Sequence, residues 1–179
     1  MKRAVLLLAA AILSAAGGDG PQFTSDGRME YPRDYRQWIF LSSGLGMTYG
    51  PLASTSEPRF DNVFVNPSAY HRFLETGTWP DGTVMVLEVR SSQSKGSINQ
   101  GGHFQGADVT GVEVHVKDSK RFERKWAFFG FQGEGPAKAV PAGASCFTCH
   151  EQHGAVDTTF VQFYPTLMPA AKARGTLKQ

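Results

Sequence analysis

The segment Cys146-Phe147-Thr148-Cys149-His150 constrains this chain more than any other part of its sequence. Its two cysteines are the only ones among 179 residues. The C-x-x-C-H pattern is typical of c-type haem attachment, in which two thiols add to the haem vinyl groups and the following histidine ligates the iron. We therefore predict one covalent haem c per chain, held by Cys146 and Cys149, with His150 as iron ligand. Since the motif lies near the end of the chain, most of the fold must precede it, and we expect these earlier residues to cover the other face of the haem.

Other uses of a C-x-x-C pair fit this sequence less well. A thioredoxin-like pair opens a helix in a βαβ unit, whereas a loop rich in Gly, Pro and Ala precedes this one. A disulfide between such close cysteines would be strained. A structural zinc site needs four ligands. No second pair at ligand spacing exists among the remaining histidines, which are His71, His103, His115 and His153.

The N-terminus has the composition of a secretory signal. Lys2 and Arg3 are followed by the apolar run 5–13 and by small residues at 14–17. The apolar run is shorter than the roughly 20 residues of a membrane span. We expect residues 1–17 to be a signal peptide and the protein to be periplasmic, where bacteria attach c-type haem. A retained N-terminal anchor is the alternative.

Charge and length bound the remaining chain. The sequence holds 18 Lys and Arg against 16 Asp and Glu, and the loss of Lys2 and Arg3 would leave the mature protein formally neutral. It has no basic run, so we predict no nucleic-acid partner. The polar, Gly-rich segment 18–30 is predicted to be a flexible leader, and residues 31–179 are long enough for one domain with its own core.

The order of the predicted elements indicates the fold class. We predict strands at 60–65, 83–90, 109–116 and 126–131. Asn66-Pro67 should start a helix that Gly77 ends. The predicted helical segments are 31–41, 157–163 and 165–173, and the predicted long loops are 42–58, 93–106 and 133–143. Strands in the middle with helices at both ends favour an α+β fold, a central antiparallel β-sheet with flanking helices.

Several further segments resemble the cytochrome P-460 family, which includes the cytochromes called c′-beta. Their shared order and spacing, over nearly all of the mature chain, carry the resemblance. The segments are Tyr35-Arg36-Gln37-Trp38, Asn62 to Pro67, Gly77 to Thr83, Val116 to Phe122, Trp126 to Phe129, Cys146 to His150, Asp157 and Phe160 to Pro165.

The resemblance implies several properties. It implies a small, mostly antiparallel β protein with flanking helices, usually a homodimer, whose five-coordinate haem iron has an open distal side. In the founding members a lysine is bonded covalently to the haem, the enzymes oxidise hydroxylamine, and a distal glutamate helps to move protons.

Two positions decide how far this activity carries over. The cross-linking lysine is matched by Leu87, which has no nucleophile, so this cross-link cannot form. The distal carboxylate is matched by Glu113. We therefore expect Leu87 to contact the haem and Glu113 to act as the catalytic proton carrier.

Strand alternation extends this prediction to neighbouring residues. Met85 and Val89 should share the side of Leu87, whereas Glu88 and Val86 face the other way; His115, Gly111 and Lys117 should share the side of Glu113. Burial in an apolar pocket would raise the pKa of Glu113. Met85 is a candidate sixth iron ligand, and His115 is a candidate hydrogen-bond partner of a bound ligand. The candidate pocket aromatics are Phe40, Phe60, Phe73, Phe128, Phe129, Phe160 and Phe163.

The sequence leaves four functions open. The first is a periplasmic haem protein that binds NO or turns over small nitrogen or peroxide species at an open iron. The second is hydroxylamine oxidation, against which Leu87 argues. The third is an electron carrier with a sixth protein ligand, and the fourth is a haem-stabilised module without turnover. The expected partners are a small nitrogen ligand, a redox partner cytochrome and a second copy of the chain.

Overall fold

The computed structural model describes residues 18–48 and 57–178. Within these ranges five strands form one antiparallel sheet in sequence order: β1 Ile39–Leu45, β2 Phe60–Val65, β3 Val84–Gln93, β4 Phe104–Lys117 and β5 Trp126–Phe131. The helices are α1 Pro67–Thr76, α2 Ser145–His153 and α3 Met168–Arg174, with short 3-10 turns η1 Tyr35–Gln37 and η2 Val161–Phe163. The predicted α+β class with a central antiparallel sheet is confirmed.

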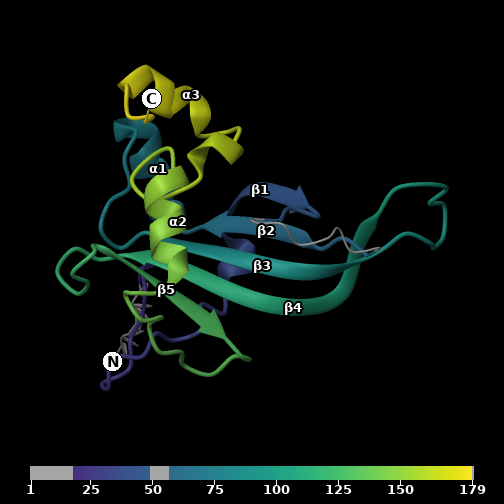
Figure 1. Ribbon diagram of the computed structural model, residues 1–179, viewed down its shortest axis with the longest axis horizontal. Helices are drawn as coiled ribbons and strands as arrows, with labels where there is room; N and C mark the ends of the chain where they lie inside the picture. Colours follow the sequence, from purple (N-terminus) through teal and green to yellow (C-terminus); the bar gives the residue numbers. More distant parts are fainter. Residues whose placement is uncertain (1–17, 49–56, 179) are drawn as a thin grey trace, which may run out of the picture.

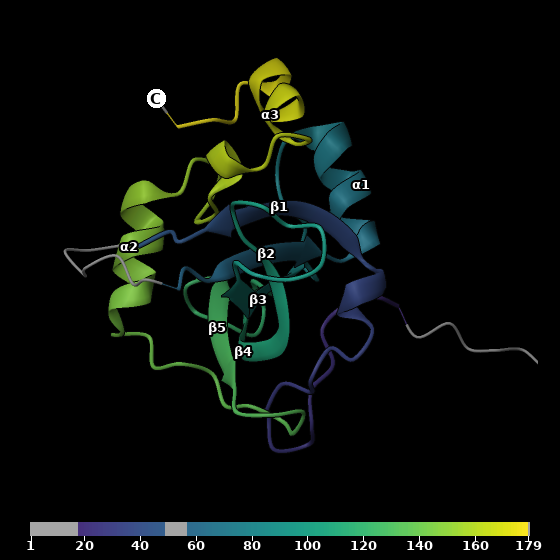
Figure 2. The same ribbon diagram turned by 90° about the vertical axis from the view of Figure 1, so that its right-hand side faces the viewer.

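Different parts of the chain cover the two faces of the sheet. The three helices lie on one side and the N-terminal segment lies on the other (Figures 1 and 2). Alternation along β3 produces this division, because Met85 packs in the core beneath α1 and α3 while Val84 and Val86 pack in the opposite core. The helix-side core also holds Phe73 and Trp79.

Strands β3 and β4 form a long hairpin that projects beyond the rest of the sheet (Figure 1, right). Its loop is shorter than the predicted loop 93–106, because β4 already begins at Phe104. At the hairpin tip, the side chain of Ile98 is 91% exposed. None of the helices in the described part of the chain has the length and apolar content of a membrane span.

Helix α1 follows its sequence signals with one change. Pro67 begins it, and Gly77 ends it in the left-handed conformation at φ 72°. Asn66 does not cap it with its side chain. Instead its Oδ1 accepts a bond from the Val84 amide at 2.8 Å, and its Nδ2 donates to the Gly82 carbonyl at 3.1 Å. The side chain therefore ties the start of the helix to β3.

Two predicted helices are wrong. Residues 31–41 form only η1 and the start of β1, because Trp38 is extended and Ile39 pairs with Val65. Residues 157–163 form only η2, because Asp157 adopts a left-handed conformation. In both places packing against distant segments overrides a local helical pattern. The third predicted segment, 165–173, is helical over Met168–Arg174.

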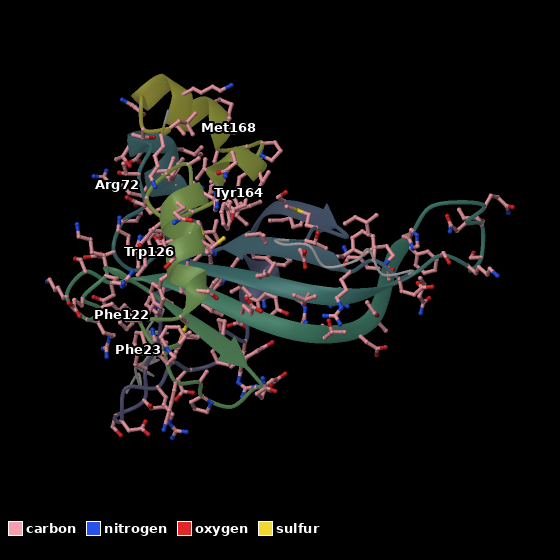
Figure 3. All side chains as sticks on the ribbon, viewed as in Figure 1. Phe23, Arg72, Phe122, Trp126, Tyr164 and Met168 are labelled. Atoms are coloured by element: carbon pink, nitrogen blue, oxygen red, sulfur yellow. The ribbon has the colours of Figure 1, made fainter. Side chains whose placement is uncertain are left out.

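The segment 18–30 belongs to the fold rather than to a free leader. Phe23 and Met29 form an antiparallel bridge, and Met29 also pairs with Ala137. Met29 is 1% exposed in the core, and the Phe23 ring lies 6.1 Å from that of Phe122 (Figure 3). These two packed residues were not predicted from the sequence, because the rest of the segment is polar and rich in glycine. The predicted signal peptide, residues 1–17, lies outside the described residues, as does part of the predicted loop 42–58.

Candidate haem site

Helix α2 carries the whole C-x-x-C-H motif. Spacings of three and four residues place Cys146, Cys149 and His150 on one helical face, and all three line one cavity. Both cysteines are half-buried, and neither forms a disulfide. Phe147 is buried, and its ring lies 4.8 Å from that of Phe128 on β5. This packing holds the helix against the sheet.

The cavity has a volume of about 450 Å³. This lies within the range of cofactor pockets, roughly 300–1,000 Å³. Its walls come from α2, from strands β2, β3, β4 and β5, and from the residues on either side of η2. The lining residues are Val63, Met85, Leu87, Glu113, Val114, His115, Phe128, Ser145, Cys146, Cys149, His150, Thr159, Phe160 and Tyr164.

Two rows of cross-strand neighbours form the sheet side of the cavity. In one row Met85 pairs with His115, which pairs with Phe128. In the next row Leu87 pairs with Glu113. Four of the residues that strand alternation assigned to this face, Met85, Leu87, Glu113 and His115, thus line one cavity. Val89, Gly111 and Lys117, assigned to the same face, are not part of its lining.

The His150 ring is oriented as a metal ligand would be. Its Nδ1 donates a hydrogen bond to the Thr158 carbonyl at 2.7 Å, which leaves the proton-free Nε2 to bind a metal. The rings of Phe160, Phe128 and His115 surround it at centroid distances of 4.4, 4.7 and 5.0 Å. Burial lowers the pKa of His150, and the bond to Thr158 opposes this shift only in part. The imidazole is therefore neutral near pH 7.

His115 supplies an unpaired polar atom in the same cavity. The residue is 7% exposed, and its Nε2 is buried without a hydrogen-bond partner. Its ring stacks on Phe128 at 4.0 Å and lies 4.3 Å from Trp126. Burial lowers the pKa of His115 well below its ordinary value, and His150 adds to the effect. A neutral buried nitrogen without a partner is costly, so a bound molecule with a polar group would relieve it.

Together these residues fit a haem. The two thiols match covalent attachment, the neutral imidazole matches an iron ligand, and the largely apolar walls match the macrocycle. When bound, haem supplies an iron that can hold a small ligand or exchange an electron. Elsewhere, the residues 18–48 and 57–178 contain no group of three or more His, Cys, Asp or Glu that could hold a metal ion.

Glu113 lines the cavity but is more exposed than expected. The sequence led us to expect a buried carboxylate, whereas its side chain is exposed at the cavity edge. Sequence reasoning missed a second carboxylate, Asp61, which is half-buried on the same face of the sheet because it pairs with Val89. Burial raises the pKa of Asp61, and the charge of Glu113 raises it further. Alternation along β2 was the signal that could have found it.

The other predicted residues separate into those in the cavity and those outside it. Leu87 lies in the cavity and carries no amine. Lys117 is on the same strand face, but its ammonium group is engaged by the Trp79 carbonyl and the Asp157 carboxylate. Of the seven candidate phenylalanines, Phe128 and Phe160 line the cavity. Phe73 and Phe129 pack in the two cores, Phe60 is half-buried outside the lining, and Phe40 and Phe163 are exposed.

One comparison with known proteins gives a match. A model of the family described as Cytochrome P460 matches residues 32–161, which include the C-x-x-C-H motif and all five strands. Among curated proteins, none was found to match the chain.

Proposed function

The chain belongs to the cytochrome P460 family, and from this premise we propose that it is an exported haem c cytochrome whose iron keeps one position open for nitric oxide or a related small nitrogen compound. The family makes the protein a haem-binding cytochrome. The covalent bonds from Cys146 and Cys149, the single haem per chain and the nature of the ligand are parts of the proposal.

One observation carries the proposal. A neutral His150, fixed by its bond to Thr158, shares an apolar cavity with Leu87. The imidazole would be the protein ligand of the iron. Leu87 and Val63 exclude water, which favours a neutral diatomic ligand over an ion. Glu113 stands at the cavity edge, where it can exchange protons with water and with a bound ligand.

The cellular setting completes the proposal. The N-terminal sequence supports export to the periplasm. We propose a periplasmic cytochrome as redox partner and a homodimer as the assembled form, both on the basis of the family resemblance.

The absorption spectrum of the ferrous protein tests the proposal, with the chain produced in cells that attach c-type haem. We expect a Soret band at an ordinary c-type position with five-coordinate, high-spin character, and stoichiometric binding of added NO. Replacement of both cysteines by alanine should leave haem that acid-acetone extracts, whereas the wild-type haem should stay with the protein. Failure of NO to bind the ferrous protein would contradict the proposal.

The same spectrum identifies the two alternatives. A strongly red-shifted Soret band would mean a modified macrocycle despite Leu87 and would favour hydroxylamine oxidation. Sharp low-spin bands would favour an electron carrier. Met85 lines the cavity at 5% exposure and is the candidate sixth ligand in that case. A Met85→Leu variant would then become high-spin.

We expect Glu113→Gln to lower the pKa of Asp61. The charge of Glu113 is one of the causes that raise this pKa, and glutamine removes the charge with little change of shape. Carbon-detected NMR titration of the Asp61 carboxyl measures the shift directly. An unchanged Asp61 pKa would show that the two carboxylates do not interact.

The same variant tests proton exchange at the cavity. The probe is hydrogen cyanide, which loses its proton when cyanide binds ferric iron, so its association requires a proton acceptor. Glu113→Gln should flatten the pH dependence of cyanide association, while NO affinity at fixed pH stays constant. Glu123→Gln, which alters a carboxylate in the turn between β4 and β5 that is not part of the cavity lining, is the matched control. Equal pH profiles for wild type and Glu113→Gln would exclude the role of Glu113.

A further inference from the structure

A lysine outside the cavity lining is fixed beside the loop that orients His150. Lys117, the last residue of β4, has a side chain that is only 15% exposed. Its Nζ donates to the Trp79 carbonyl at 2.8 Å and pairs with Asp157 Oδ2 at 2.8 Å. Long lysine side chains are rarely confined in this way, because confinement costs side-chain entropy. The position therefore indicates a specific geometric task.

The partner of Lys117 belongs to a turn whose backbone conformation is strained. Asp157 has φ 52°, in the left-handed region that residues other than glycine rarely adopt. The next residue, Thr158, provides the carbonyl that accepts the hydrogen bond from His150 Nδ1 at 2.7 Å. The carbonyl can point at the imidazole only while the turn keeps this conformation.

The far side of the turn is also anchored. Thr159 is 1% exposed, and its Oγ1 accepts a bond from Trp79 Nε1 at 2.8 Å and donates to the Val156 carbonyl at 2.8 Å. Trp79 thus contacts both Lys117, through its carbonyl, and Thr159, through its indole N–H. Two residues from distant segments hold the turn on either side of Thr158.

We propose that Lys117 is a positioning residue for the iron ligand, which acts by holding Asp157 so that the Thr158 carbonyl stays aimed at His150 Nδ1. The inference rests on the proposed function in that His150 ligates the iron. A carbonyl bound to Nδ1–H raises the basicity of Nε2. A more basic ligand binds ferric iron more tightly and lowers the reduction potential. Loss of the Lys117–Asp157 pair loosens the turn, weakens that hydrogen bond and raises the potential.

The sign of the potential shift separates this role from a simple field effect. Removal of a positive charge near the haem, acting through space, would favour ferric iron and lower the potential. Lys117→Met removes the charge and the contact together while it keeps side-chain length. If the contact to the turn dominates, the potential rises instead. Lys120→Met removes the same charge from an exposed lysine nearby and serves as the matched control.

The experiment uses the full haem-loaded protein and two readouts. The first is the reduction potential by spectroelectrochemical titration, and the second is the iron–histidine stretching band in resonance Raman spectra of the ferrous form. For Lys117→Met we expect the ratio of reduced to oxidised protein at a fixed potential to rise about tenfold, which is about 59 mV for one electron. The Raman band should move to lower frequency. Asp157→Asn should shift both in the same direction, and Lys117→Arg should recover most of the wild-type values.

The other outcomes contradict either the positioning role of Lys117 or the ligation of iron by His150, and the two readouts distinguish these cases. A Lys117→Met variant with a lower melting temperature but an unchanged potential and Raman band would make Lys117 purely structural. A lowered potential would show a field effect alone. If Lys117→Met does not fold, Asp157→Asn and Lys117→Arg decide through the Raman band, because loss of the Asp157 charge would raise the potential by itself. An unchanged Raman band in Asp157→Asn overturns the proposal. Absence of the iron–histidine band in the wild type would instead refute His150 ligation, and with it the proposed function.

Discussion

Replacement of Glu88 by methionine is expected to destabilise the protein by about 3 kcal/mol, because it leaves two arginines without their buried partner. Glu88 is 2% exposed on the face of β3 opposite the cavity. Its Oε2 accepts bonds from Tyr35 Oη at 2.5 Å and from Arg36 Nε at 2.8 Å, and its Oε1 accepts from Arg90 Nε at 2.5 Å. Asn62 Nδ2 adds a longer bond at 3.4 Å. We take the lower end of the range for a broken buried pair because Arg36 is half exposed and can turn to water.

Urea denaturation measures this effect against a matched control. Glu75 pairs with Arg72 on the surface of α1, where both side chains are more than half exposed. Glu75→Met should cost less than about 1 kcal/mol, as exposed ion pairs contribute little. In both variants the slope of the unfolding free energy against urea concentration should stay unchanged, so a difference in midpoint reports a difference in stability directly. Equal midpoints for Glu88→Met and Glu75→Met would contradict the prediction.

The Glu88 cluster also predicts how stability depends on pH. Burial alone would raise the pKa of Glu88, but the hydrogen bonds from Arg90, Tyr35 and Arg36 outweigh it and lower the pKa from 4.5 to about 2. A carboxyl with a lower pKa in the folded state stabilises the fold fully above its unfolded pKa. This contribution should decline as pH falls from about 4.5 towards about 2. Glu88→Met should lack this part of the acid limb.

Replacement of Gly154 by alanine is expected to cost about 1–3 kcal/mol, the range for forcing extra atoms into a packed site. An added Cβ would lie 2.6 Å from the His150 carbonyl oxygen, 2.8 Å from Thr158 C and 2.8 Å from Thr159 N. All three are main-chain atoms, so no side-chain rotation relieves the clash. Gly154 has φ −67°, which any residue can adopt. Its requirement is therefore the close approach of the end of α2 to the turn that contacts His150.

Thermal unfolding and haem content of the purified protein measure this second effect. Gly154→Ala should lower the melting temperature and push the Thr158 carbonyl away from His150, so the iron–histidine Raman band should shift as well. Gly143→Ala, in the loop before the motif, is the matched control because nothing lies within 4 Å of an added Cβ there. A Gly154→Ala protein with wild-type stability would show that the turn can move freely.

Local patterns in the sequence were informative where one rule decides a residue's place. The spacing within Cys146 to His150 puts both thiols and the imidazole on one face of any helix, and the structure has them in one cavity. Alternation along β3 assigned Leu87 and Glu88 to opposite faces, as observed. What each face meets was not predictable in this way. The exposure of Glu113 and the partial burial of Asp61 depend on which segments surround the edge of the cavity.

Errors occurred where distant contacts override local preference. The pattern of Tyr35, Trp38 and Ile39 fits a helix, but the Tyr35 hydroxyl bonds to Glu88 and Ile39 pairs with Val65. Asn66 has the identity of a helix cap, yet the backbone of β3 and the turn before it occupy its side chain. A local pattern predicts a preference of about 1 kcal/mol or less per residue, which several tertiary hydrogen bonds readily exceed.

The sequence by itself determined the haem motif, the valine-rich strands of an antiparallel sheet, the α+β class and the absence of a lysine at position 87. Only the tertiary structure decided which groups support the motif. The Thr158 carbonyl at His150, the Lys117–Asp157 pair and the close contact at Gly154 join segments whose sequences carry no mark of one another. The physical reason is that residue spacing determines which side chains are neighbours within one helix or strand, whereas the packing of separate elements determines which groups contact His150.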